Sequence, residues 1–211
     1  PLAMILVAPR SARLGERFGS GKVITTGFCV VAFGFTVTAL TAATTPYWVL
    51  GMAYAVMGAG MAMTSAPATG NIMSAVPAGK AGVGSAVNDT TREFGGALGI
   101  AVTGSLMSSL YRSGISTEGL RLPPEAADAA RESVGAATSI ARTLPGGGRE
   151  LAEQALNAYA GSYRIINVFC AVLAAAGALG VARFFSSGKE MEANQSPPET
   201  TPEPVGAGLP G

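Results

Sequence analysis

Long uncharged runs are the feature that most limits how this chain can fold. Between Lys22 and Lys80 lie 57 consecutive residues without Asp, Glu, Lys or Arg, and two further uncharged runs cover 94–111 and 165–182. A helix of eighteen residues rises about 27 Å, close to the thickness of bilayer hydrocarbon. Only 13% of the residues are charged, against roughly 25% in a typical soluble domain. The runs predict an all-α membrane protein with about four complete transmembrane helices plus part of a fifth.

The run over 94–111 is rich in glycine, alanine and serine, whereas a soluble core helix shows polar residues along its outer face. Its small residues recur every four positions, which lets helix backbones approach closely in a membrane. A similar four-residue repeat of glycine and alanine marks the apolar stretch 47–76. The predicted helix-packing residues are Gly58, Gly70, Gly95 and Gly99.

Prolines, glycines and charges divide the chain into segments. The apolar start, closed by Pro9, resembles the last turns of a span, so we expect the chain to be the C-terminal piece of a longer protein. The predicted segments are the end of a span (1–9), a loop (10–22), spans at 23–43 and 47–76, a loop with a helix start (77–93), a span (94–111), a polar hairpin of two helices at 125–144 and 149–163 (within 112–164), a last span (165–185) and a disordered tail (186–211).

Basic residues in the short loops predict the orientation. The 10–22 loop holds four Lys or Arg residues and the 77–93 loop holds two, whereas the 44–46 turn holds none. Short basic loops stay in the cytoplasm. We therefore expect a multi-pass protein of the plasma membrane, with both basic loops and the C-terminus in the cytoplasm and the 112–164 hairpin outside.

The 10–22 loop carries a recognisable motif. Its sequence ARLGERFGSGK resembles the G-x-x-x-D-R-x-G-R-R signature between paired spans of the major facilitator superfamily. Glu16 stands for the aspartate and Arg17 and Gly19 match, while Ala12 replaces the first glycine and Lys22 comes one place late. An acid at a helix end can pair with arginines and helix dipoles and hold one conformational state closed.

The stretch REFGGALGIAVTGSL resembles the penultimate span of the fourteen-span drug:proton antiporters of that superfamily. The resemblance covers about residues 1–185 and implies the C-terminal part of a major facilitator bundle. It further implies proton-driven export of lipophilic small molecules by alternating access. The implied partners are the lipid bilayer, a small-molecule substrate, protons and the N-terminal spans of the same protein.

A charged cluster stands where the 94–111 span begins. Asp89, Arg92 and Glu93 are gating candidates, and Arg92 and Asp89 are three residues apart and can meet on one helix face. The alternative is a structural role, because Thr90 and Glu93 have the spacing of a capping box.

Side chains off the small-residue stripe of 47–76 are candidates for a substrate cavity. Methionine adapts to varied ligands, and a polar amide within an apolar span bonds across helices or lines water. Packing against lipid or other helices is the alternative role for each methionine. The cavity candidates are Tyr54, Met57, Met61, Thr64, Ser65 and Asn71.

Several function classes lack the residues they need. The chain has no histidine, the commonest metal ligand and general base, and no basic face with interleaved aromatic residues. We therefore expect no catalytic site, metal, cofactor or nucleic-acid partner. The alternatives to a drug exporter are a non-transporting membrane scaffold or auxiliary subunit, an exporter of an endogenous metabolite and, more remotely, an intramembrane enzyme.

Overall fold

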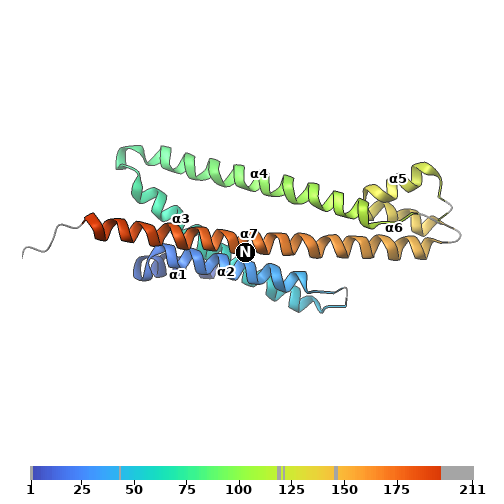
Figure 1. Ribbon diagram of the computed structural model, residues 1–211, viewed down its shortest axis with the longest axis horizontal. Coiled ribbons are helices and arrows are strands. Elements are labelled where there is room, and N and C mark those ends of the chain that lie inside the picture. The colour runs from blue at the N-terminus through green and yellow to red at the C-terminus, as the bar shows by residue number, and fades with distance from the viewer. Residues whose placement is uncertain (1, 43, 118–119, 121, 145–146, 196–211) are drawn as a thin grey trace, which may run out of the picture.

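The computed structural model describes residues 2–42, 44–117, 120, 122–144 and 147–195, and every regular element within them is helical (Figure 1). Four helices are long and apolar enough to cross a membrane: α2, α3, α4 and the 148–185 part of α7. This confirms the predicted all-α fold class. The elements are α1 (Leu2–Phe18), α2 (Ser20–Ala39), α3 (Tyr47–Ala75), the 3-10 helix η1 (Ala78–Lys80), α4 (Ala81–Gly114), α5 (Pro124–Glu132), α6 (Val134–Thr143) and α7 (Gly148–Gln195).

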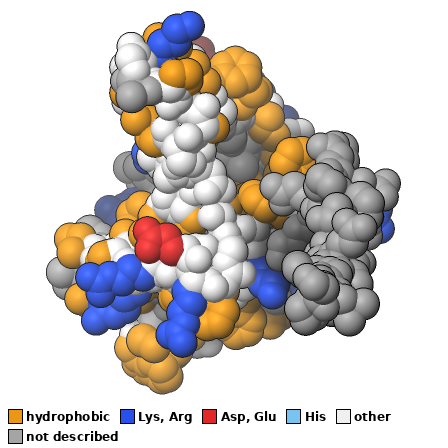
Figure 2. Space-filling view, turned by 90° about the vertical axis from the view of Figure 1, so that its left-hand side faces the viewer, with side chains coloured by type: hydrophobic (Ala, Val, Ile, Leu, Met, Phe, Trp, Pro, Cys, Tyr) orange, Lys and Arg blue, Asp and Glu red, His pale blue; other side chains and the backbone are white. Residues whose placement is uncertain are grey.

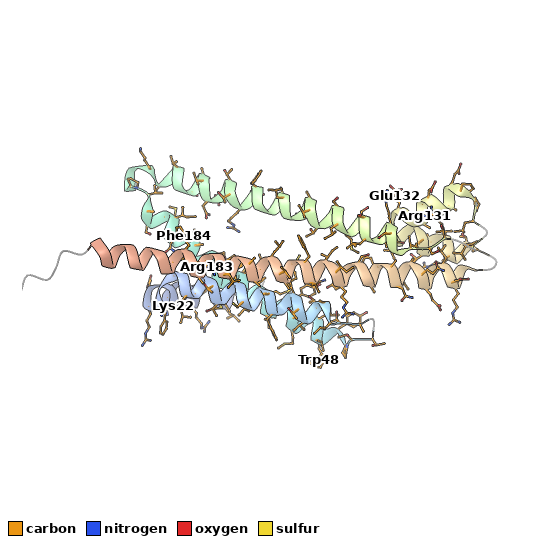
Figure 3. All side chains as sticks on the ribbon, in the orientation of Figure 1. Lys22, Trp48, Arg131, Glu132, Arg183 and Phe184 are labelled. Carbon is orange, nitrogen blue, oxygen red and sulfur yellow. The ribbon has the colours of Figure 1, made fainter. Side chains whose placement is uncertain are left out.

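The long helices run between two ends of the molecule. At one end, on the left of Figure 1, α1 meets α2 at Gly19, η1 joins α3 to α4, and α7 finishes. We call this the Gly19 end, and Lys22 and Arg183 lie toward it (Figure 3). The α5–α6 end holds both short helices, and Arg131 and Glu132 lie there.

Helix α2 is the centre of the bundle, because it packs closely on both α3 and α7. It crosses α3 at Gly27 and Gly60, where a Cβ on either glycine would lie 2.8 Å from the carbonyl oxygen of the other. Both backbones therefore touch directly, as small residues permit in membrane helices. Along α7, Phe28 covers Gly177 with its ring edge 3.0 Å from the Cβ position of that glycine.

Helix α1 lies against α3 through one hydroxyl and one glycine. The fully buried Ser11 Oγ donates to the carbonyl oxygens of Ala8, at 2.8 Å, and of Ala62, at 3.1 Å. One turn further, Gly15 faces the ring of Pro67, with 3.4 Å between the glycine Cβ position and the proline Cβ.

The α5–α6 end has a hydrophobic core of its own. Helices α4, α5, α6 and α7 each contribute to it, and the Tyr111 hydroxyl donates to the carbonyl oxygen of Ala130 at 3.0 Å. We call this unit the α5–α6 subdomain. Its buried core residues are Tyr111, Ile115, Ala130, Ala137, Leu151, Ala155 and Ala158.

The connection between α1 and α2 differs from the sequence prediction. The expected loop over 10–22 is helical except at Gly19, and α1 continues through Pro9 to Phe18. A proline removes one helical N–H bond but does not end a helix that packing supports. Here Ser11 and Gly15 supply that packing against α3.

Helix α4 also begins earlier than expected. It starts at Ala81, so Thr90 and Glu93 lie inside the helix and the predicted capping box is wrong. The span 94–111 lies in the later part of a 34-residue helix whose first turns are polar. The strongest helix-breaking residue before Ala81 is Pro77, which precedes η1.

The second half of the chain differs in two further places. The polar helix expected over 125–144 is two helices that meet at Ser133, whose extended backbone and side chain cap α6 by accepting from the Ala136 N–H at 3.1 Å. The helix expected over 149–163 does not end before the last span, because α7 is one helix of 48 residues. Residues 186–195, expected to be disordered, continue this helix, and 196–211 lie outside the described residues.

The Gly27–Gly60 crossing gives a direct test of α2–α3 packing. Replacing Gly60 with leucine should lower the free energy of unfolding by about 1–3 kcal/mol or more, because the side chain would collide with the α2 backbone. The measurement is the thermal unfolding of the purified protein in detergent. Gly51→Leu is the matched control in the same helix, since nothing described lies within 4 Å of its Cβ position. An equal loss in both variants would contradict the close crossing.

Candidate functional site

Polar side chains from three helices gather at the Gly19 end. They join α2 to the apolar helix α3, and α3 to the polar first turns of α4. Asn88 is buried, three of the six are half-buried, and Ser85 and Asp89 are exposed. Polar groups buried within membrane helices commonly mark a functional region. We call this set the Gly19-end cluster, and it consists of Ser20, Thr69, Asn71, Ser85, Asn88 and Asp89.

The first half of the cluster depends on the break between α1 and α2. Gly19 adopts φ +91°, a conformation that L side chains rarely take. The chain reverses there, and α2 begins at Ser20 beside α3. The Ser20 hydroxyl then donates to Asn71 Oδ1 at 2.9 Å. The Asn71 amide, a predicted cavity residue, is thus tied to the start of α2.

The second half joins α3 to α4. The Thr69 hydroxyl lies 3.5 Å from Asn88 Oδ1, and Asn88 is only 8% exposed. The Asn88 amide donates to Asp89 Oδ1 at 3.4 Å, and the Ser85 hydroxyl lies 3.5 Å from Asp89 Oδ2. Nearby, Gly84 lets Val76 approach to 2.9 Å from its Cβ position. The start of α4 is therefore fixed to the end of α3.

The charged gating candidates are arranged differently from the prediction. Glu16, Arg17, Arg92 and Glu93 are exposed. The ion pairs among the described residues are Arg112–Glu132 and Arg149–Glu153, both at the α5–α6 end. The Arg92–Asp89 pair that the spacing allows is not among them, and Asp89 accepts hydrogen bonds from uncharged neighbours.

The cavity candidates on α3 divide between two environments. Met57 lies against Gly34, and the Thr64 methyl group lies 2.8 Å from the Cβ position of Gly27, so both fill the α2–α3 contact. Tyr54 and Met61 are more than half exposed, and Ser65 is half-buried. The pocket described below, between α6 and α7, is lined by none of the six candidates.

The predicted packing glycines also lie in two different environments. Gly58 lies 3.9 Å, measured from its Cβ position, from Ala3, but nothing described comes within 4 Å of that position in Gly70, Gly95 or Gly99. Every residue from 89 to 102 in α4 is exposed. The small-residue stripe of α4 thus faces away from the described helices, and its role in packing remains a prediction.

Sequence reasoning missed a buried polar pair toward the other end. The Thr38 hydroxyl donates to Asn167 Oδ1 at 2.7 Å, and both residues are less than 10% exposed. The Asn167 amide donates to the Tyr163 carbonyl oxygen, and the Tyr163 and Tyr54 hydroxyl oxygens lie 3.3 Å apart. The available signal was Asn167 itself, the strongly polar residue in the uncharged 165–182 run.

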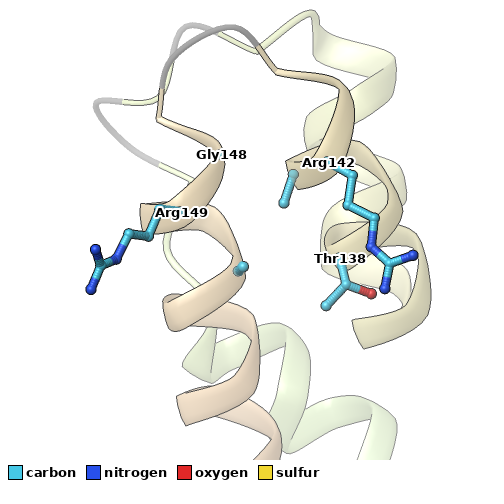
Figure 4. A pocket seen from close by; sticks show the side chains of 6 residues that line it. Thr138, Arg142, Gly148 and Arg149 are labelled. Carbon is cyan, nitrogen blue, oxygen red and sulfur yellow. The ribbon is translucent and has the colours of Figure 1, made fainter.

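A shallow pocket lies between α6 and α7, with a volume of about 310 Å³. Arg142 and Arg149 lie at its edges, and their guanidinium groups point in different directions (Figure 4). Arg149 already donates to Glu153 Oε1 at 2.8 Å. The pocket therefore has no convergent set of polar groups, and we do not assign it a ligand.

Four long apolar helices, joined by polar contacts within the bundle, define a multi-pass membrane protein. Residues 1–100 match the model of the Major Facilitator Superfamily, and the chain belongs to that superfamily. The multidrug efflux pump LfrA of Mycolicibacterium smegmatis is 31% identical over 173 residues, which are 81% of this chain and 34% of that protein.

Two further relatives carry different names. The methyl viologen resistance protein SmvA of Salmonella typhimurium is 35% identical over 149 residues, 69% of this chain and 28% of that protein. The riboflavin transporter RibZ of Clostridioides difficile is 30% identical over 108 residues, 51% of this chain and 24% of that protein. The chain thus spans about a third or less of the length of these curated relatives.

Adding one methyl group at Gly19 tests the backbone conformation of the turn between α1 and α2. Gly19→Ala should lower the free energy of unfolding by about 1–2 kcal/mol, since the left-handed backbone is costly for an L residue. Gly79→Ala is the control, because Gly79 has open space and no positive φ. Chemical unfolding followed by tryptophan fluorescence from Trp48 measures both. If the two variants unfold alike, the backbone at Gly19 is not left-handed in the protein.

Proposed function

We propose that the chain is the C-terminal part of a proton-coupled exporter of lipophilic small molecules that works by alternating access. The observation that carries the proposal is the similarity to a named multidrug efflux pump over 81% of the chain. Because 173 of the 211 residues are aligned, the similarity reaches beyond residues 1–100 into the second half of the chain. A scaffold or auxiliary subunit has no comparable support.

We propose that the Gly19-end cluster belongs to the region that closes the cytoplasmic side. Among the described residues, its Ser20–Asn71 and Thr69–Asn88 hydrogen bonds tie the start of α2 and the start of α4 to α3. Its charged neighbours are exposed and so are free to contact the remaining spans of the transporter. In this proposal Glu16, Arg17, Arg92 and Glu93 make ion pairs with those spans in one state and separate in the other.

The same proposal places the Gly19 end in the cytoplasm. Figure 2 looks onto this end and shows basic side chains in several places around the helix ends. Arg10, Arg13 and Arg17 lie on α1, and Lys22 is in the first turn of α2. Basic residues near short connections favour the cytoplasmic side. The α5–α6 subdomain then lies outside the cell, with the plasma membrane between.

A second candidate function is the transport of a metabolite instead of drugs. It is favoured by the similarity to a protein named as a riboflavin transporter, over 51% of the chain. The methionine and tyrosine side chains of α3 suit flat aromatic molecules of either kind. The two candidates differ in substrate and share the membrane fold and the mechanism of alternating access.

Efflux is tested with the full-length transporter in cells that lack their own dye exporters. Expression should reduce the steady-state accumulation of ethidium several-fold, and a protonophore should restore accumulation to the level of empty-vector cells. Riboflavin uptake and release are measured in the same cells. Unchanged ethidium together with altered riboflavin would favour the metabolite transporter, and no change in either would count against both.

Topology is tested by labelling single cysteines. Ser139 is exposed on α6, and Gly79 is exposed in η1 at the Gly19 end. In a background without native cysteines, Ser139→Cys should react with an impermeant maleimide in intact cells, whereas Gly79→Cys should react only after lysis. The reverse pattern would invert the proposed orientation.

A further inference from the structure

The α5–α6 subdomain joins two helices that otherwise lie apart. Figure 1 shows α4 diverging from α7 toward the Gly19 end and approaching it where α5 and α6 lie. Residues 89–102 of α4 are all exposed. In contrast, Tyr111 and Ile115 at the far end of α4 are buried in the subdomain core.

The join is tight and made of several independent contacts. Gly114 faces Ala158 of α7, with 3.3 Å between the glycine Cβ position and the alanine Cβ. The Tyr111 hydroxyl reaches the last turn of α5 at 3.0 Å. Leu151 and Ala155 of α7 are fully buried in the same core. Cores with fully buried side chains are closely packed and resist gradual deformation.

From this contrast we infer that the α5–α6 subdomain is a fixed joint between α4 and α7. The ends of the two helices in the subdomain stay together through the whole transport cycle. When the angle between α4 and α7 changes, the two helices move apart or together at the Gly19 end. The inference rests on the proposed function, because it concerns the motion that alternating access requires. It gives the subdomain a mechanical role beyond that of a connecting segment.

Tyr111 is a positioning residue in this joint. Its ring is in the core, and its hydroxyl binds a backbone carbonyl, so it connects α4 to α5 without reaching any proposed substrate contact. Tyr111→Phe keeps the ring and removes that hydrogen bond. We expect it to lower kcat for ethidium export about two- to fivefold with KM unchanged. Tyr47→Phe, at a residue that is 91% exposed, is the control and should change neither.

A disulfide across the joint tests the inference directly. Cβ atoms in a disulfide are about 3.5–4.5 Å apart, so Gly114→Cys with Ala158→Cys needs only a small adjustment. The pair is made in the full-length transporter after replacement of Cys29, Cys170 and any other native cysteine. Each single cysteine variant serves as a control. Disulfide yield in membranes is read from the gel shift caused by a maleimide–polyethylene glycol reagent.

The expected result is a high disulfide yield with export of ethidium at the rate of the reduced protein. The disulfide should also restore the kcat that Tyr111→Phe loses, which a substrate-contact role for Tyr111 would not allow. Failure of the disulfide to form, or export that stops on oxidation and returns on reduction, would overturn the joint. A cysteine-free parent that exports no ethidium counts against the efflux function instead, and the joint is then judged on disulfide yield alone.

Discussion

Direct contact between helix backbones is the constraint on which the bundle depends. In hydrocarbon there is little hydrophobic gain from helix association, so close packing must supply the attraction. At Gly27 and Gly60 the absence of both side chains brings α2 and α3 together. This contact sets where Met57 and Thr64 lie and how far Ser20 is from Asn71. The Ser20–Asn71 hydrogen bond between α2 and α3 therefore depends on this close approach.

Polar contacts add specificity to this packing at two levels of the bundle. The Ser20–Asn71 and Thr69–Asn88 pairs join neighbouring helices at the Gly19 end, and the Thr38–Asn167 pair joins α2 to α7 nearer the other end. Each membrane hydrogen bond contributes only about 0.6–2 kcal/mol. Their value lies in selecting one rotation of each helix about its axis, because a rotated helix would leave an amide without a partner.

The sequence predicted the fold class well, because charge-free runs report directly on the solvent around a helix. The bounds of α3 were predicted to within one residue, since Pro46 and Pro77 lie just outside both its ends. Prediction failed where local signals compete with packing. Pro9 does not end α1, and Thr90 lies inside α4. The candidate site was predicted only in part: Asn71 was identified by polarity, but its partner Ser20 and the Asn88 pair depend on helix crossings that one sequence does not reveal.

The length of α7 has a consequence for how distant parts of the chain communicate. Its 48 residues make a rod about 72 Å long, more than twice the thickness of bilayer hydrocarbon. A tilt of about 5° around one end would displace the other by roughly 6 Å over that length. A tilt of α7 that begins on one side of the bilayer therefore displaces the end of the same helix on the other side.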